Sequence, residues 1–377
     1  MSGIYFHIPF CKQACHYCNF HFSTSLKHKD AVLKAMKKEL ALYRKQGWKG
    51  PVETVYFGGG TPSLLSAGEI EGFLDQVATC FGIEESAEIT LEANPDDLSR
   101  ESIEALGRSP VNRLSVGIQS FNKDELRWMN RAHTREQALE SLDAIATHFP
   151  NYSMDLIYGV PGSNLSTWES NLALALGFSP PHISAYALTV EPKTALHSHI
   201  ERGLSQDVDE EGTQQQFEHL VSALEQAGYD HYEISNFAHP GFYSRNNSAY
   251  WKGSPYLGIG PSAHSFDGRK RWWNPSHNLK YLRALENGQL PGQVELLSPR
   301  DRYNETVMTG LRTRWGVSLS QIRTEFGKAY EEYLILQAGP YLRDQFLFME
   351  EDVLYTARKG KFLADGIASD LFMINLK

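Results

Sequence analysis

Short runs of β-branched and aromatic residues alternate with longer amphipathic runs over the first two-thirds of the chain, and this order restricts the possible folds. The predicted strands cover residues 4–8, 54–57, 88–92, 113–118, 153–158 and 183–188. The predicted helices cover residues 30–44, 67–81, 135–147 and 166–176. A repeated strand–helix order implies parallel strands joined by right-handed crossovers. The chain is therefore predicted to be an α/β protein built on an open or closed barrel.

The character of the sequence changes after residue 237. A helix at 210–227 and a strand-like stretch at 232–237 still follow the α/β pattern, but residues 238–287 are rich in Gly, Pro, Asn and Trp. Beyond residue 298 we predict helices at 302–311, 318–326 and 331–342, a hairpin at 347–355 and a last helix at 360–371. Helices followed by a small hairpin indicate a winged-helix-like module. We predict a barrel over 1–237, a loop-rich connecting segment over 238–297 that covers the barrel, and a smaller C-terminal domain over 298–377.

The overall composition excludes two classes of protein. The net charge is −9, whereas a nucleic-acid binder needs a basic footprint. No apolar stretch approaches the roughly 20 residues that span a bilayer, and the N-terminal residues lack the features of a secretory signal. We therefore expect a cytoplasmic protein with no nucleic-acid partner and no membrane span, either a monomer or a homodimer.

Three of the four cysteines fall within eight residues, in the pattern Cys11-x-x-x-Cys15-x-x-Cys18. Iron–sulfur cubanes are held by thiolates, normally four, so three ligands would leave one iron open to another molecule. The alternative is a structural zinc site completed by a nearby histidine, for which the candidates are His7, His16 and His21. The fourth cysteine, at position 80, lies in an amphipathic helical run and is expected to be a small buried apolar residue.

Further polar or glycine-rich positions follow the ends of the predicted strands. Three glycines at 58–60 follow the second strand, Glu92 ends the third, and Gln119 follows the fourth. Arg131 and Asp155 add further donors and acceptors. Because barrels of parallel strands place their active sites at the carboxyl ends of the strands, we expect these residues to share one rim with the cysteines.

Several longer motifs carry a resemblance to a known family. With the cysteine triplet, they are Tyr-Phe-His-Ile-Pro-Phe-Cys at 5–11, Gly-Gly-Gly-Thr-Pro at 58–62, Val-Gly-Ile-Gln-Ser-Phe at 116–121 and Asp-Leu-Ile-Tyr-Gly-Val-Pro-Gly at 155–162. They resemble the radical S-adenosylmethionine family that includes oxygen-independent coproporphyrinogen III dehydrogenase and the haem chaperone HemW. The resemblance continues through 232–237 and 256–261 to 362–372, and so covers nearly the whole chain. It implies a partial parallel (β/α) barrel of the radical S-adenosylmethionine type with a C-terminal domain of the HemN type.

The resemblance also implies a role for each matching residue. Cys11, Cys15 and Cys18 would bind a [4Fe–4S] cluster whose open iron chelates S-adenosylmethionine, and the pair would cleave the sulfonium reductively to a 5′-deoxyadenosyl radical. The other implied cofactor contacts are Tyr5 and Tyr17 beside the cluster, Gly59, Gly60 and Thr61 at the methionine part, Glu92, Gln119, Arg131 and Asp155 as polar contacts, and Ala187 near the adenine.

Two differences from the dehydrogenase favour a HemW-like protein. The dehydrogenase has a further cysteine where this chain has Phe20, and it has a long N-terminal extension, whereas ten residues precede Cys11 here. The chain also differs from HemW, because Asn246 occupies the position of a histidine implicated in haem binding. Asparagine is a poor ligand for haem iron, so we expect haem to bind weakly or through another residue, with His239 and His264 as nearby candidates.

Three functions follow as expectations. The first is a HemW-like chaperone that binds haem and S-adenosylmethionine, delivers haem to acceptor proteins, and requires an electron donor. The second is a radical S-adenosylmethionine enzyme that acts on a porphyrin or haem, although Phe20 argues against coproporphyrinogen dehydrogenase activity. The third is a structural protein stabilised by zinc.

Overall fold

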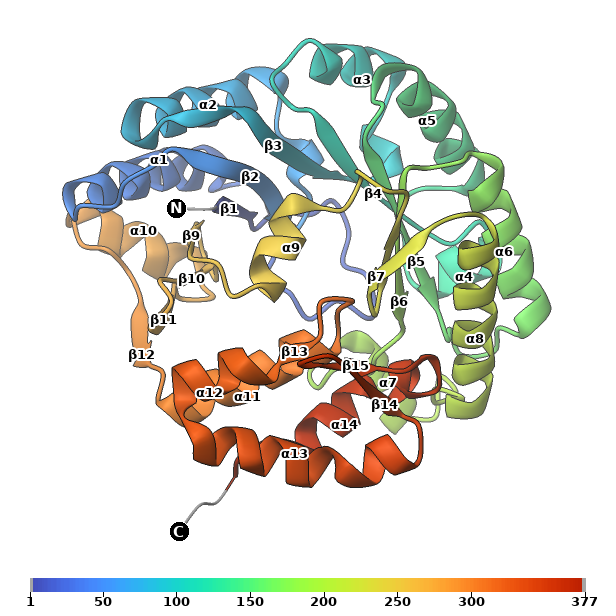
Figure 1. Ribbon diagram of the computed structural model, residues 1–377. Coiled ribbons are helices and arrows are strands. Elements are labelled where there is room, and N and C mark those ends of the chain that lie inside the picture. The colour runs from blue at the N-terminus through green and yellow to red at the C-terminus, as the bar shows by residue number, and fades with distance from the viewer. Residues whose placement is uncertain (1–2, 375–377) are drawn as a thin grey trace.

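The chain forms one large curled sheet and a smaller C-terminal domain (Figure 1). The computed structural model describes residues 3–374. Among these residues, the large sheet has 12 strands in the order β12-β11-β10-β9-β1-β2-β3-β4-β5-β6-β8-β7. The sheet is open at both ends and curls into a partial barrel, with the crossover helices on its outer side (Figure 1). The sequence-based prediction of a partial parallel barrel is confirmed.

The six predicted strands form the parallel centre of this sheet, each paired with the next. Their apolar residues form one continuous core with the crossover helices. The strands are β1 (Gly3–Ile8), β2 (Val52–Gly59), β3 (Ile83–Ala93), β4 (Arg113–Gln119), β5 (Tyr152–Tyr158) and β6 (His182–Ala187). The helices that follow them are α1 (Lys29–Lys45), α2 (Ala67–Phe81), α3 (Arg100–Gly107), α4 (Lys123–Trp128), α5 (Arg135–His148), α6 (Leu165–Gly177), α7 (Ala195–Glu201) and α8 (Glu210–Gln226).

Shorter strands extend the sheet at both edges. At one edge, β8 (Asn236–Ala238) pairs antiparallel with β6 and with β7 (Asp230–Glu233). At the other, β9 (Tyr256–Ile259) pairs parallel with β1 and is followed by β10 (His264–Phe266), β11 (Lys270–Trp273) and β12 (Gln293–Leu296). The stretch 238–297, predicted to be loop-rich, thus contains four strands together with α9 (Arg245–Trp251) and α10 (Asn278–Glu286). Strands of three or four residues separated by glycine-rich turns are too short to show a period of two.

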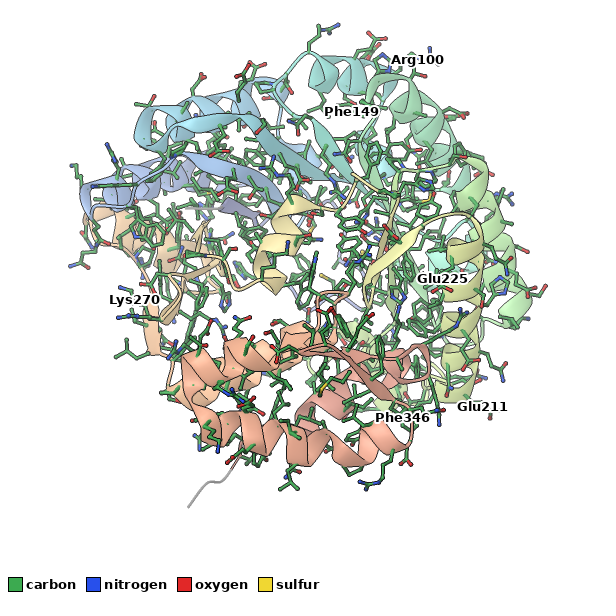
Figure 2. The ribbon with its side chains drawn as sticks, in the orientation of Figure 1. Arg100, Phe149, Glu211, Glu225, Lys270 and Phe346 are labelled. Atoms are coloured by element: carbon green, nitrogen blue, oxygen red, sulfur yellow. The ribbon has the colours of Figure 1, made fainter. Side chains whose placement is uncertain are left out.

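The C-terminal domain has its own apolar core. It contains helices and a hairpin at the predicted place, and a short strand that was not predicted adds a third member to the sheet, whose order is β13-β15-β14. Its elements are α11 (Pro299–Leu311), β13 (Val317–Ser318), α12 (Leu319–Phe326), α13 (Lys328–Arg343), β14 (Leu347–Glu350), β15 (Val353–Thr356) and α14 (Ala364–Asp370). Side chains pack between these helices and project into the curl of the large sheet (Figure 2).

Two polar clusters hold distant segments together. Arg312 Nη2 lies 2.9 Å from Glu233 Oε1, and this contact joins the C-terminal domain to the edge strand β7. The fully buried Glu39 of α1 accepts hydrogen bonds from the Gly260 amide (2.9 Å), Asn274 Nδ2 (2.7 Å) and the Tyr281 hydroxyl (2.5 Å). Because a buried carboxylate needs such donors, the second cluster fixes the segment from β9 to α10 against α1.

None of the helices between residues 3 and 374 combines the length and apolar character needed to cross a membrane.

Replacement of Glu39 by Gln is expected to reduce the pH dependence of stability. Burial raises the pKa of Glu39 to about 7, well above the ordinary value of 4.5 for an unfolded chain. Between these pH values the folded protein holds a proton that the unfolded chain has released, so this group makes stability fall as pH rises from about 4.5 to 7. Glu39→Gln should reduce that slope by up to about 1.4 kcal/mol per pH unit, measured by urea unfolding at several pH values. Glu71→Gln, at an exposed position, is the control substitution. Equal slopes in Glu39→Gln and wild type would contradict the assignment.

Candidate functional site

A cavity of about 560 Å³ opens inside the curl at the carboxyl ends of β1–β6. Its lining comes from the cysteine loop, the glycine loop after β2 and the inner faces of the parallel strands. Twelve of the thirteen residues singled out in the sequence line it, and Tyr5 does not. Those that do are Cys11, Cys15, Cys18, Tyr17, Gly59, Gly60, Thr61, Glu92, Gln119, Arg131, Asp155 and Ala187.

The cysteine loop between β1 and α1 is held by backbone hydrogen bonds. The Cys11 amide donates to the Ser23 carbonyl (3.1 Å), and the Cys18 amide donates to the Cys15 carbonyl (3.3 Å). All three thiols are free and partly exposed to the cavity. The loop therefore presents three potential ligands from a fixed backbone.

The electrostatics of the thiols suit a strongly cationic ligand. Burial raises the pKa of Cys11 and raises that of Cys18 to about 11, so both are neutral thiols at pH 7. The guanidinium of Arg131, with Nη1 3.4 Å from Cys15 Sγ, is the cation beside them. Iron or another metal binds the thiolate, and its charge would supply the compensation that the buried thiols otherwise lack. The donor set therefore fits an iron–sulfur cluster.

The histidines proposed for a zinc site each have one ring nitrogen in a hydrogen bond, and none of them gathers with the cysteines as a metal site would require. His7 Nε2 lies 2.9 Å from the His21 carbonyl oxygen, His16 Nδ1 lies 2.8 Å from the Trp128 carbonyl oxygen, and His21 Nε2 lies 2.8 Å from Asn278 Oδ1. Within residues 3–374, no three His, Cys, Asp or Glu side chains gather closely enough to hold one metal ion. The cysteines of a cubane cluster bind separate irons, so they need not converge on one point.

The glycine loop packs directly on the cysteine loop. A Cβ at Gly60 would lie 2.6 Å from the Phe10 carbonyl oxygen, and one at Gly59, whose φ is +107°, would lie 2.7 Å from the His7 ring. Only glycine tolerates both the close approach and the left-handed backbone. The glycines at these positions thus let the two loops share one wall of the cavity.

Glu92, at the end of β3, is held by donors from β2. The Tyr56 hydroxyl donates to Oε1 (2.8 Å) and the Gly59 amide donates to Oε2 (3.1 Å). Burial, with a further contribution from the nearby Asp155, raises the pKa of Glu92 to about 7, although the hydrogen bonds from Tyr56 and Gly59 lower it. Tyr5 stands behind this pair: its ring stacks on Tyr56 at 6.0 Å and its hydroxyl hydrogen-bonds to His7. Tyr5 therefore contacts Tyr56 and His7 and is not among the lining residues, and its expected contact with the cofactor stays a prediction.

Asp155, on β5, is surrounded by hydroxyl groups. The Ser115 and Ser153 hydroxyls each donate to its carboxylate at 2.9 Å. Burial raises its pKa, while those hydroxyls and the cation of Arg113 lower it. Arg113 is 1% exposed, and its Nε and Nη2 have no hydrogen-bond partner in the described part of the chain. It is the positive charge at the base of the cavity.

Arg131 joins the cysteine loop to β4. Its Nη2 donates to the Gly117 carbonyl (2.8 Å) and to Asn94 Oδ1 (2.7 Å). Gln119 follows in a left-handed backbone with φ +65°, at an irregularity in the pairing of β4 with β5. Such backbone strain in a residue other than glycine is typical of binding sites.

Sequence reasoning missed several lining residues, including Arg113, Ser115, Tyr56 and Ser184. Arg113, Ser115, Gly117 and Gln119 alternate along β4 and all reach the cavity. A period of two along that predicted strand was the available signal, because alternate residues of a strand share one face.

Comparisons with known proteins show which families the chain resembles. The pattern of the Radical SAM superfamily matches residues 5–175, and that of the HemN C-terminal domain matches residues 297–363. The chain is 33% identical to the heme chaperone HemW of Lactococcus lactis, over 97% of this chain and 98% of the relative. It is 37% identical to that of Synechocystis, over 85% and 80% of the two chains. In structure it resembles the Escherichia coli coproporphyrinogen III oxidase HemN, a radical SAM enzyme, with a TM-score of 0.85, 24% identity and coverage of 99% and 90%.

Replacement of Tyr56 by Phe is expected to raise the pKa of Glu92 above its present value of about 7. The Tyr56 hydroxyl donates to the carboxylate, and losing a hydrogen bond to a charged group should raise the pKa by about one to two units. Infrared titration of the carboxyl stretch would measure the shift, with Glu92→Gln to assign the band. Tyr5→Phe removes a hydroxyl that bonds to His7 and should leave the midpoint near the wild-type value. An unchanged midpoint in Tyr56→Phe would contradict the assignment.

Proposed function

This chain belongs to the HemW family of radical S-adenosylmethionine proteins, and on that premise we propose that it is a haem chaperone. It binds S-adenosylmethionine and haem, and it delivers haem to acceptor proteins. The observation that carries the proposal is the similarity to heme chaperone HemW along 97% of the chain, together with a cavity that gathers the cysteine triplet and the polar rim residues. The acceptors are proposed as a class, apoproteins that bind haem, and the electron donor as a protein that transfers one electron.

The resident cofactors of this proposal are a [4Fe–4S] cluster on Cys11, Cys15 and Cys18 and S-adenosylmethionine at the remaining iron. When bound, this pair supplies reductive cleavage of the sulfonium to methionine and a 5′-deoxyadenosyl radical. The chain's own groups bind, orient and shield the cofactor. Arg131 balances the negative charge of the thiolates, because its Nη1 lies 3.4 Å from Cys15 Sγ.

The other lining residues are proposed to position S-adenosylmethionine. Gly59, Gly60 and Thr61 offer backbone groups to the methionine part, and Glu92 offers a carboxylate beside them. Further residues hold the adenosyl part or cover the cluster, and they are Gln119, Asp155, Ala187 and Tyr17. In this proposal Tyr5 is a positioning residue that acts through Tyr56.

Asn246 does not serve as the haem ligand in this proposal. Its side chain is 4% exposed, Oδ1 accepts from the Thr54 hydroxyl (3.3 Å), and its backbone amide donates to Glu88. The residue thus belongs to the barrel interior. His239 and His264 are proposed only as secondary candidates for iron ligation. His239 stacks on Tyr229 at 4.0 Å and so is held against the barrel edge.

We also propose a reducing compartment, such as the cytoplasm. The chain has four free cysteines, three of which are partly exposed in one loop. Such thiols persist as metal ligands where disulfides are kept reduced.

The cluster ligands can be tested by anaerobic reconstitution with iron and sulfide. Wild type is expected to hold about four iron atoms per chain, to give a cluster signal in electron paramagnetic resonance after reduction, and to release 5′-deoxyadenosine from S-adenosylmethionine. Cys15→Ala should lose the signal and the product. Cys80→Ala, in the buried face of α2, should keep both. One equivalent of zinc and no cluster would revive the zinc-stabilised alternative, and turnover of a porphyrin would favour a radical enzyme.

The role assigned to Asn246 can be tested by haem titration. Asn246→Ala is expected to bind haem with wild-type affinity, because its side chain is occupied inside the barrel. Absorbance of the haem Soret band would measure the affinity, and thermal unfolding would report the cost of the lost interior contact. A loss of haem affinity without a loss of stability would make Asn246 part of the haem site.

A further inference from the structure

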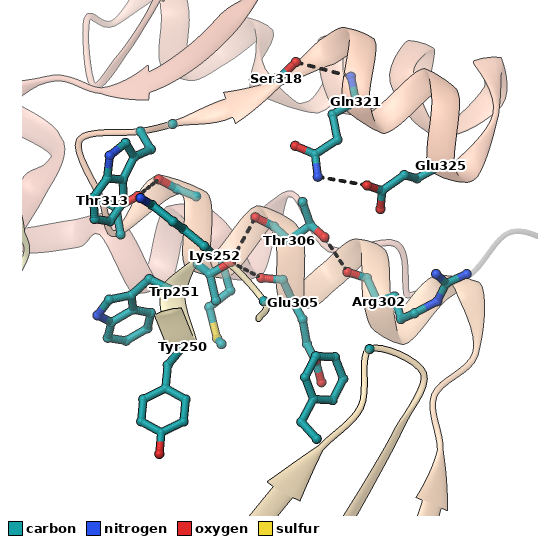
Figure 3. Close-up of a pocket in the computed structure, with 18 of the residues that line it drawn as sticks. Tyr250, Trp251, Lys252, Arg302, Glu305, Thr306, Thr313, Ser318, Gln321 and Glu325 are labelled. Carbon is teal, nitrogen blue, oxygen red and sulfur yellow. Dashed lines mark hydrogen bonds between the residues drawn. The ribbon is translucent and has the colours of Figure 1, made fainter. Parts of the chain in front are cut away.

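A second cavity, of about 610 Å³, lies between the barrel and the C-terminal domain (Figure 3). On the barrel side, Tyr250, Trp251 and Lys252 line it at the end of α9. On the other side, α11 and α12 contribute residues that include Arg302 and Phe326. It shares no lining residue with the cofactor cavity. Its volume lies within the range of roughly 300–1,000 Å³ that is typical of ligand pockets.

The walls of this cavity are largely aromatic. Tyr250, Trp251, Phe266, Trp315 and Phe326 all reach its surface. Tyr250 packs edge-to-face on Tyr256, with ring centroids 4.4 Å apart, so its ring is held in place. A large planar apolar ligand would find flat ring surfaces on both sides of the cavity.

Two cations in this cavity have no acidic partner. Lys252 Nζ lies 4.3 Å from the centroid of the Trp315 ring, and the Arg302 guanidinium lies 5.5 Å from that of Phe326. Neither takes part in an ion pair within residues 3–374. The third lining cation differs, because Arg271 Nη2 is paired with Glu305 Oε1 at 2.8 Å. The donors of Lys252 and Arg302 are thus available to an anion that enters the cavity.

We propose that this inter-domain cavity is the haem site, with the macrocycle against the aromatic walls and the two propionates at Lys252 and Arg302. The assignment rests on the proposed function. Aromatic walls together with two unpaired cations match an apolar disc that carries two carboxylates, and lysine and arginine bind carboxylates through charge-assisted hydrogen bonds. The cofactor cavity is a poorer match, because its lining includes three carboxylates, Glu92, Asp155 and Glu191. Two carboxylates line the inter-domain cavity: Glu305 is paired with Arg271, and Glu325 accepts a hydrogen bond from Gln321.

The position of α9 explains how a chain without the family histidine can still bind haem. Tyr250 and Trp251 end this helix and line the inter-domain cavity, whereas Asn247 lines the cofactor cavity. In this site the aromatic walls recognise the macrocycle, and Lys252 and Arg302 recognise the propionates. The buried Asn246 is not among the lining residues. One short helix therefore contributes to both cavities.

The experiment compares two ligands on the holo protein: haem and haem dimethyl ester, in which both propionates are uncharged. Wild type should bind haem more tightly than the ester, measured by Soret absorbance. Lys252→Gln and Arg302→Gln should each weaken haem binding about tenfold, and the double variant about a hundredfold, because each removes a charge-assisted hydrogen bond. The affinity for the ester should change little. Arg300→Gln lies on the same helix outside the cavity and should behave as wild type.

The remaining outcomes would contradict the assignment, and they distinguish failure of the haem site from failure of the proposed function. If wild type binds haem and the double variant binds it equally well, the haem site lies elsewhere while the proposed function stands. If wild type does not bind haem, both fail. Cluster content and thermal unfolding identify a variant that has lost its fold. The charge-conserving Arg302→Lys should then retain the preference for haem over the ester, and its loss of that preference with an intact fold would reject a role for charge.

Discussion

Parallel pairing of β1–β6 is the constraint on which the rest of the molecule depends. Each strand pairs with the next, so all six carboxyl ends open on the same side of the curled sheet. The cysteine loop, the glycine loop and Glu92 follow successive strands and therefore meet around one cavity, although up to 80 residues separate them. The glycines allow the first two loops to touch, because any side chain at Gly60 would collide with the carbonyl of Phe10.

The cofactor cavity is lined by buried charged side chains of both signs. Glu92 and Asp155 are deprived of water, which raises both pKa values, and hydroxyl and amide donors from neighbouring strands compensate only in part. Arg113 at the start of β4 and Arg131 in the loop after α4 supply the opposing charge. Desolvated charges with incomplete internal compensation are typical of sites that complete their interactions with a ligand. The raised thiol pKa values follow the same physics, since a buried thiolate requires a cation.

The C-terminal domain adds a second surface to this barrel. Arg312 links it to Glu233 on the edge strand β7, and the interface leaves an aromatic cavity with two unpaired cations. The helix α9 borders both cavities, which places the proposed haem site beside the proposed S-adenosylmethionine site. Such proximity offers a physical route by which one ligand could influence the other, because a shift of a packed helix is felt on both of its sides.

The sequence by itself determined the six parallel strands, the cysteine triplet, the glycine loop and the polar rim, because strand periodicity and motif spacing are local properties of the chain. Only the tertiary structure decided that Tyr5 lies behind Tyr56, that Arg113 charges the base of the cavity, and that Asn246 is buried inside the barrel. It also decided that residues 238–297 extend the sheet and that α9 and α11 enclose a cavity. These features depend on contacts between segments that are distant in sequence. Such contacts do not change the periodicity of the residues next to a side chain, so the local sequence does not reveal them.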